Sequence, residues 1–221
     1  MTKSYADIKR ITTELRERDP RLGLVKGLVV IRPCGHWVRG LFLDRRTPKD
    51  VFVLSTLVQA LYVPASGIRP GLGREVRAPR ERGARSGVWN PFWPNCGKLL
   101  ADLAVDHLLP EVEAAATPDT FPSILDMSVI PLGVTEERIL THALAGRLEE
   151  AAAMARAYLE THQGAPWARV KPSDRRRRER LIRIFESGQA RTNRLLRTFE
   201  RTMARRLGVE KWWEWKPFVN A

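Results

Sequence analysis

The chain has 221 residues, is 43% hydrophobic and carries a formal net charge of +13, so it is long enough to bury a sizeable core. This length fits one large domain or one domain with a smaller appendage. Two cysteines exclude a disulfide framework. The N-terminus is charged throughout and lacks the apolar stretch of a signal peptide, and the longest apolar run, residues 51–63, is too short to span a bilayer. We therefore expect a soluble, cytoplasmic protein with no membrane partner.

Arginine dominates the basic residues of the chain. Of the 38 basic side chains, 30 are Arg and 8 are Lys. Clustered basic side chains release counterions from phosphate, so the charge favours nucleic acid as one class of partner. The skew toward Arg, together with abundant Ala, is also typical of codon bias across a genome. A solvated basic surface, or one that binds an acidic protein, therefore stays open beside nucleic-acid binding.

An N-terminal helix is predicted over residues 4–18. Ser4 is placed to cap it, and Ile8, Ile11 and Leu15 recur at spacings of three and four residues, which is the pattern of one apolar helix face. Such a stripe is typical of a helix that packs against a core. We expect this helix to cover one face of a sheet.

A β-meander is predicted over residues 24–64, the only long region rich in β-branched and aromatic residues. Turn-forming residues divide this region into three apolar runs. The predicted strands are residues 24–32, 36–44 and 51–63. The last strand is apolar on both faces, so we expect it to be central and covered on both sides. Arg39 interrupts the second strand, and we expect it near an edge or facing a groove because a buried guanidinium needs a partner.

A long basic loop, residues 64–95, follows the predicted sheet. It contains five Pro, five Gly and six Arg, and a loop of this length is commonly functional or disordered. Ile68 and Leu72 favour one more short strand before Gly73. An Arg-rich loop flanked by Trp residues is suited to gripping an acidic partner or single-stranded nucleic acid, whereas the simpler interpretation is a solvated loop whose Trp residues fold back onto the core. The binding candidates in this loop are Arg74, Arg77, Trp89 and Trp93.

Helices are predicted in most of the remaining chain. The predicted helices are residues 98–116, 121–127 and 135–161. Pro110 is expected to kink the first of them or to start a second helix. The last one reads as a helical hairpin, with Thr135 as its cap and Gly146 at its turn.

Two amphipathic helices with basic outer faces are predicted over residues 173–186 and 189–207. The aromatic tail that follows either docks on the protein or anchors a partner, since Trp is a frequent hot-spot residue. We expect docking, because exposed clustered Trp promotes aggregation. The binding candidates in this part of the chain are Arg176, Arg180, Arg194, Trp212 and Trp213.

Together these elements predict an α+β fold. It has an N-terminal helix, an antiparallel β-meander covered by helices and a C-terminal helical region. We expect residues 1–130 to form an α+β domain that contains the long basic loop, and residues 131–221 to form a helical extension.

No motif for catalysis, metal binding or cofactor binding stands out. Cys96 precedes a helix whose amides would lower a thiol pKa, but nucleophilic catalysis also needs a base such as His36 or His107 nearby. The Cys and His residues lack the paired spacing of a zinc site. Asp102 and Asp106 lie one turn apart and would suit a divalent ion, although acidic residues on a wet helix face explain them better. The sequence therefore predicts no cofactor and no metal, and it favours a protein that is not an enzyme.

Three short segments carry a resemblance to known proteins. They are residues 31–33 (IRP), 35–40 (GHWVRG) and 58–64 (VQALYVP). Over residues 20–130 the chain resembles a group of uncharacterised bacterial α+β proteins, whose strands followed by helices are arranged as in small immunity-type or toxin-neutralising domains. In that group a proline follows Gln59, where this chain has Ala60. The resemblance implies a sheet followed by helices, and it carries over no catalytic residue.

The leading prediction is a non-enzymatic bacterial cytoplasmic interaction protein, of the immunity or defence-system subunit type, that binds an acidic protein partner. The alternative is a nucleic-acid-binding protein that uses its Arg-rich C-terminal helices. A third hypothesis is a hydrolase or nuclease with the acidic pair and His107 as its site. The polar residues set among the apolar runs of the sheet complete the binding candidates: His36, Arg39 and Gln59.

Overall fold

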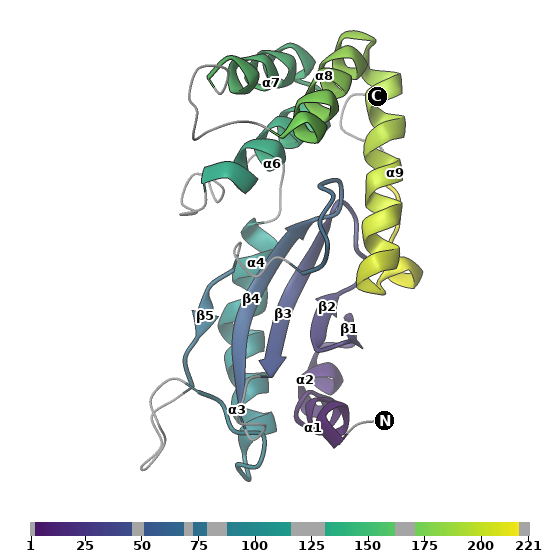
Figure 1. Cartoon of the computed structure of the whole chain (residues 1–221). Helices are drawn as coiled ribbons and strands as arrows, with labels where there is room; N and C mark the ends of the chain where they lie inside the picture. Colours follow the sequence, from purple (N-terminus) through teal and green to yellow (C-terminus); the bar gives the residue numbers. More distant parts are fainter. Residues whose placement is uncertain are drawn as a thin grey trace.

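One antiparallel sheet lies at the centre of the fold (Figure 1). The computed structural model describes residues 3–45, 51–68, 73–78, 88–115, 131–161 and 171–216. The strands are β1 (Leu22–Val25), β2 (Leu28–Ile31), β3 (Trp37–Arg45), β4 (Phe52–Ala60) and β5 (Glu75–Val76). They follow one another in the sheet in the order of the sequence, and each neighbouring pair is antiparallel. The predicted α+β meander is confirmed.

The region predicted as one strand over residues 24–32 is a hairpin of two strands. Lys26 and Gly27 have φ angles of 48° and 81°, the left-handed conformations that a tight two-residue hairpin turn requires. Val25 then pairs with Leu28 directly across the turn. Apolar residues on both sides of the Lys-Gly pair concealed this turn in the sequence. The other two predicted strands correspond to β3 and β4, which pair over nine residues.

The predicted N-terminal helix is two helices, α1 (Lys3–Ile11) and α2 (Thr13–Arg18). They are separated at Thr12, whose hydroxyl donates a hydrogen bond of 2.8 Å to the carbonyl of Ile8 one turn earlier. A threonine hydroxyl bound in this way competes with the helical backbone and bends the helix. Ser4 lies inside α1 instead of capping it.

The predicted helix of residues 98–116 also has an internal break. It consists of α3 (Cys96–Leu103), the π-helical turn η2 (Ala104–Leu108) and α4 (Leu109–Ala115). Pro110 has no N–H, and in a regular α-helix its ring would collide with the carbonyl of Asp106, so the wider turn relieves that contact. The predicted break near Pro110 is confirmed. The helix predicted over residues 121–127 lies outside the described residues.

The C-terminal helices match their predicted positions. They are α6 (Pro131–Leu144), α7 (Leu148–Thr161), α8 (Pro172–Glu186), α9 (Gln189–Leu207) and the short η3 (Glu210–Trp212). Gly146 has a φ of 78° at the turn of the α6–α7 hairpin, as a left-handed position requires. Thr135 lies inside α6, which begins at Pro131, so its predicted role as a cap is wrong.

Helices cover the sheet on both faces. On one face Val29, Leu41 and Val58 share a buried cluster with residues of α1 to α4 and of α6 to α9. On the other face Val30 and Leu57 share a second cluster with the C-terminal part of α9, which lies beside the sheet in Figure 1. Burial of β4 on both faces confirms one prediction for this strand. β4 pairs with β3 on one side and with β5 on the other, so it lies inside the sheet, next to the middle strand β3. Arg39 lies on β3, away from the two edge strands, and the alternative that it faces a groove stays a prediction.

The predicted helical extension shares both buried clusters with the sheet. Leu140 of α6 and Phe185 of α8 belong to the first cluster, and Met203 and Leu207 of α9 belong to the second. The division at residue 130 stays a prediction. Met203 and Leu207 pack the C-terminal part of α9 against the sheet, and α9 forms one wall of the site described next.

Candidate functional site

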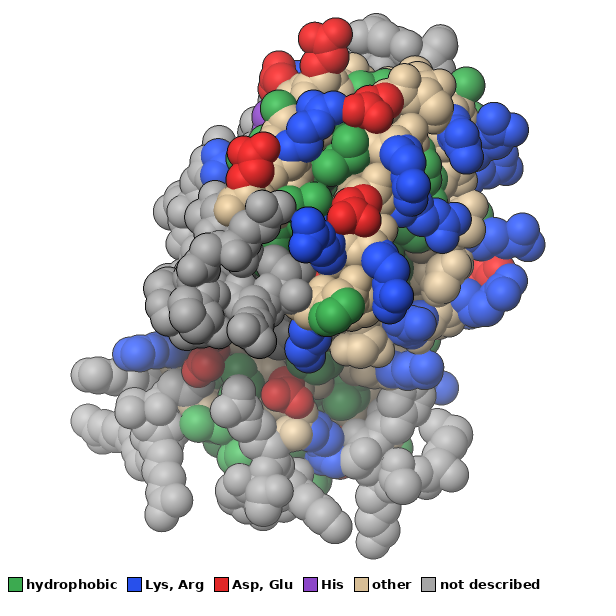
Figure 2. Space-filling view, turned by 45° about the horizontal axis from the view of Figure 1, so that its top comes forward, with side chains coloured by type: hydrophobic (Ala, Val, Ile, Leu, Met, Phe, Trp, Pro, Cys, Tyr) green, Lys and Arg blue, Asp and Glu red, His purple; other side chains and the backbone are tan. Residues whose placement is uncertain are grey.

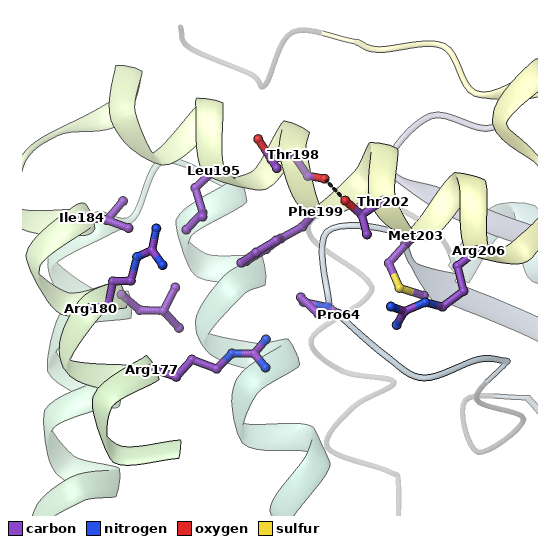
Figure 3. Close-up of a pocket in the computed structure, with 11 residues that line it drawn as sticks. Pro64, Arg177, Arg180, Ile184, Leu195, Thr198, Phe199, Thr202, Met203 and Arg206 are labelled. Carbon is purple, nitrogen blue, oxygen red and sulfur yellow. Dashed lines mark hydrogen bonds between the residues drawn. The ribbon is translucent and has the colours of Figure 1, made fainter. Parts of the chain in front are cut away.

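A groove runs between α8 and α9 (Figure 3). One part of it has a volume of about 450 Å³. Its lining consists of Pro64, Arg177, Arg180, Leu181, Ile184, Leu195, Thr198, Phe199, Thr202, Met203 and Arg206. The two helices form the groove because both are amphipathic: apolar residues at spacings of three and four turn one stripe of each helix inward.

The floor of the groove is apolar. Leu181 and Ile184 from α8 are buried, and Leu195 and Phe199 from α9 are partly buried. In Figure 3 the side chains of Ile184, Leu195 and Phe199 point toward the middle of the groove. An apolar floor that is open to solvent is suited to apolar side chains of a partner.

The groove continues toward the turn that joins the two helices. A second part, of about 500 Å³, lies there and shares four lining residues with the first part. Its lining consists of Arg180, Arg183, Ile184, Arg191, Arg194, Leu195 and Thr198. We call the two parts together the α8–α9 groove, and this second part its arginine end.

Arginines form the rim of the groove. Arg177 donates to a carboxylate oxygen of Glu136, and Arg206 donates to the carbonyl of Ala65. By contrast, the guanidinium of Arg180 has no acidic partner within the described part of the chain. In Figure 2, Lys and Arg gather with hydrophobic side chains between them on the side where Figure 1 places α9.

The described part of the aromatic tail docks on the protein through residues 212–214, whereas Trp215 is 40% exposed and Phe218 lies outside the described residues. The backbone N–H of Cys34 donates to the carbonyl of Trp212 at 2.8 Å, and the N–H of Glu214 donates to the carbonyl of Cys34 at 2.9 Å. Trp213 is partly buried, and its Nε1 donates to Oε2 of Glu200 at 3.3 Å. The binding candidates Trp212 and Trp213 therefore hold the tail against the sheet and α9, outside the groove.

The polar candidates of the sheet do not gather at a common site. Nδ1 of His36 lies 2.7 Å from Oε1 of Glu200, whose side chain is fully buried. Gln59 is buried as well, and its Nε2 donates to the carbonyl of Gly67 at 3.1 Å. Arg39 is half-buried on β3. The contacts of His36 and Gln59 hold a helix and a loop against the sheet, which is a structural role.

In the described parts of the basic loop, residues 64–68, 73–78 and 88–95, the Trp residues pack in or against the core, and one of the two arginines is paired. Trp89 is fully buried and its Nε1 donates to the carbonyl of Val76 at 2.9 Å, while Trp93 packs against the same core. Arg74 makes a bidentate ion pair with Glu111, and Arg77 is exposed. The extra strand predicted around Ile68 and Leu72 is not found at Ile68, which lies in no strand, and Leu72 lies outside the described residues. The short strand β5 comes later in the chain, after Gly73.

The structure unites two of the predicted binding residues, Arg180 and Arg194, on opposite walls of the groove. Arg176 is exposed on α8 and lies outside the lining. Leu195 and Phe199, on the floor of the groove, were not predicted from the sequence as parts of a site. The sequence does contain a signal for such a site, because apolar residues recur within one turn of arginines on both helices. This spacing does not reveal which helices face each other.

No family model, curated protein or solved structure matches this chain. The resemblance to immunity-type proteins therefore stays a prediction. Among the helices that the structure describes, none has both the length and the apolar composition needed to cross a membrane. The function has to be inferred from the charge and shape of the groove.

The acidic pair and the histidine considered for catalysis lie on α3 and η2, and none of them lines the groove. Asp102 is paired with Arg18, whereas Asp106 and His107 are exposed. Within the described residues, no three His, Cys, Asp or Glu side chains are placed to hold a metal ion. Both cysteines are buried, and burial raises the pKa of the Cys34 thiol to about 12.

We expect neither cysteine to react with iodoacetamide in the folded protein at mildly alkaline pH. Burial excludes the reagent from both thiols, and the raised pKa keeps Cys34 protonated, whereas only a thiolate is alkylated rapidly. Mass spectrometry of the intact protein should show two added groups only after unfolding in urea. Rapid labelling of the folded protein would show that a thiol is accessible and reactive.

Proposed function

We propose that this protein binds an acidic amphipathic helix of a partner protein in the α8–α9 groove. The observation that carries the proposal is an apolar floor flanked on both walls by arginines, Arg180 among them, that have no acidic partner in the described part of the chain. A helix that lies in a groove buries one apolar stripe and leaves its flanks at the rim. Carboxylates on those flanks would meet the arginines.

The dimensions of the floor suit a helix. Leu195, Phe199 and Met203 follow one another at intervals of four residues along α9. At 1.5 Å per residue they extend over about 12 Å, or roughly two turns of a bound helix. Two or three apolar side chains of a partner therefore fit along the floor, and each one fully buried contributes about 1.5–3 kcal/mol before the costs of association.

The rim supplies the charge complementarity. Guanidinium groups bind carboxylates through two parallel hydrogen bonds, and the net charge of +13 steers acidic partners toward the protein. Nucleic acid would also be attracted by these arginines. Its phosphate backbone, however, brings no apolar side chains to the floor, so the floor favours a protein partner over the alternative of nucleic acid.

The test uses a fluorescent peptide of about 18 residues with Leu at every fourth position and Glu on both flanks. Its match is a peptide of the same composition with the Leu stripe scrambled. We expect fluorescence anisotropy to show saturable binding of the first peptide only, at about 0.15 M salt. The double reversal Arg180→Glu/Arg194→Glu should weaken binding of the acidic peptide at least 30-fold. The two new carboxylates would repel the Glu side chains of the peptide, which costs about 2 kcal/mol or more.

Two further variants separate the floor from general charge. Phe199→Ser should weaken binding about tenfold, because it removes apolar contact from the floor. Arg176→Glu, on the exposed face of α8 outside the groove, should change the affinity less than twofold once salt is matched. Equal binding of both peptides, or an equal loss with Arg176→Glu, would refute the groove as the site. Tight DNA or RNA binding with a steep salt dependence, unaffected by Phe199→Ser, would favour nucleic acid instead.

A further inference from the structure

The arginines of α8 and α9 divide sharply into paired and unpaired groups. Twelve Arg lie between Pro172 and Leu207. Seven of them contact a carboxylate, a backbone carbonyl or an aromatic ring: Arg175, Arg177, Arg178, Arg197, Arg201, Arg205 and Arg206. The other five have no such partner within the described residues, and four of these five line the arginine end of the groove: Arg180, Arg183, Arg191 and Arg194.

The nearby carboxylates of the two helices are already engaged. Glu179 pairs with Arg175, and Glu186 pairs with Arg156 of α7. The hydroxyl of Thr198, which also lines this end, donates to the carbonyl of Arg194 at 2.8 Å. Two arginines from each helix thus converge on one cavity, and their mutual repulsion is not offset by any described acidic group. Such a cluster is suited to a ligand with more than one negative charge.

We propose that the arginine end binds the phosphoryl group of a phosphoserine or phosphothreonine in the partner segment. This inference rests on the proposed function and names the chemistry of its partner. A phosphoryl group carries a charge of about −1.5 to −2 and three strong acceptor oxygens, whereas a carboxylate carries a single charge and two oxygens. Each guanidinium offers five donors in a planar fork, so arginines from both helices can bind different oxygens of one phosphoryl group.

The geometry of α9 also places the phosphoryl group relative to the apolar anchors. Arg191 and Phe199 are eight residues apart on the same helix. At 1.5 Å per residue this separation is about 12 Å, or roughly seven or eight residues of a bound helix. The phosphorylated residue therefore lies about two turns from the apolar residue that contacts Phe199.

The test compares three forms of the acidic peptide, with Ser, Glu or phosphoserine placed two turns from the central Leu. Each form is made with this residue on the N-terminal side and, separately, on the C-terminal side, which covers both orientations of a bound helix. In the better orientation, the phosphoserine peptide should bind at least tenfold more tightly than the Ser peptide. The Glu peptide should bind less than threefold more tightly than the Ser peptide, because a carboxylate has less charge and fewer acceptor oxygens than a phosphoryl group.

Substitutions at the arginine end should remove the gain in affinity that phosphoserine gives over Ser, and leave the rest of the binding unchanged. Arg183→Gln/Arg191→Gln changes two residues that line only the arginine end, and we expect it to reduce the gain to less than about threefold while the Ser peptide keeps its affinity. Arg176→Gln is the matched control and should leave the gain intact. Inorganic phosphate at constant ionic strength should compete far more weakly than the phosphopeptide, because it has no apolar anchor.

The outcomes are distinguishable. If the Ser peptide binds and phosphoserine adds nothing in either orientation, the inference fails and the proposed function stands. If none of the peptides binds, both fail. If inorganic phosphate binds as tightly as the phosphopeptide, the arginine end is a site for a free anion, and the inference is wrong.

Discussion

Replacement of Gly40 by alanine is expected to lower the free energy of unfolding by about 4 kcal/mol or more. Gly40 lies in the central strand β3 with a φ of 148°, a conformation that residues with a side chain rarely adopt. A Cβ atom there would lie 1.9 Å from the carbonyl oxygen of Val29 on β2. Neither backbone can move away without breaking the pairing of these two strands, which lies between two buried clusters. Urea denaturation followed by circular dichroism measures the effect.

Gly67 is the matched control. A Cβ atom on Gly67 would have nothing within 4 Å, so Gly67→Ala should change the free energy of unfolding by less than about 0.5 kcal/mol. If most of the Gly40→Ala protein is insoluble, it can be expressed at low temperature. Hydrogen exchange of the soluble fraction then compares its stability with that of Gly67→Ala. A Gly40→Ala protein as stable as the Gly67→Ala protein would show that β2 and β3 do not approach as closely as described.

Removal of the His36 side chain is expected to cost about 3–5 kcal/mol, because His36→Ala leaves a buried carboxylate without its closest partner. The Glu200 side chain is fully buried, and among its hydrogen bonds to described residues the one to His36, 2.7 Å, is shorter than the one to Trp213. The pair connects the residue that directly precedes β3 to the middle of α9. We expect the variant to unfold at a lower urea concentration and to lose order first in α9 and the docked tail.

A second substitution tests this physical reason. In His36→Ala/Glu200→Gln the charge is gone, so the double variant should be about 2 kcal/mol more stable than His36→Ala alone. His142→Ala is the control, because His142 and Glu150 make an ion pair of similar length whose carboxylate is largely exposed to solvent. It should cost less than about 1 kcal/mol. Equal losses for His36→Ala and His142→Ala would mean that burial of Glu200 does not matter.

The buried pair also bears on the proposed binding. Glu200 directly follows Phe199, a residue of the groove floor, so the contact that holds Glu200 also fixes that part of α9. A wall that is already fixed loses little conformational entropy when a partner binds. We therefore expect His36→Ala to weaken peptide binding more than its distance from the groove suggests.

The sequence by itself determined the elements whose signals are local. The apolar spacing in residues 173–186 and 189–207 predicted α8 and α9 almost to the residue, because amphipathic periodicity is a property of each helix alone. The same holds for β3, β4 and the break near Pro110. The backbone conformations at Lys26 and Thr12 leave no clear mark in the sequence. One strand was therefore predicted where the structure has β1 and β2, and one helix where it has α1 and α2.

Only the tertiary structure decided which of these elements meet. Trp89, Gln59 and His36 were candidates for binding because polar or aromatic residues in a loop or strand fit either role. Burial assigned Trp89 and Gln59 to the core, and the contact with the buried Glu200 gave the partly buried His36 a structural role. Twelve arginines on two helices looked alike in the sequence, yet the packing of α8 against α9 left four of them unpaired around one cavity. A side chain's partner is set by contacts between segments far apart in the chain, and helical or strand periodicity carries no information about those contacts.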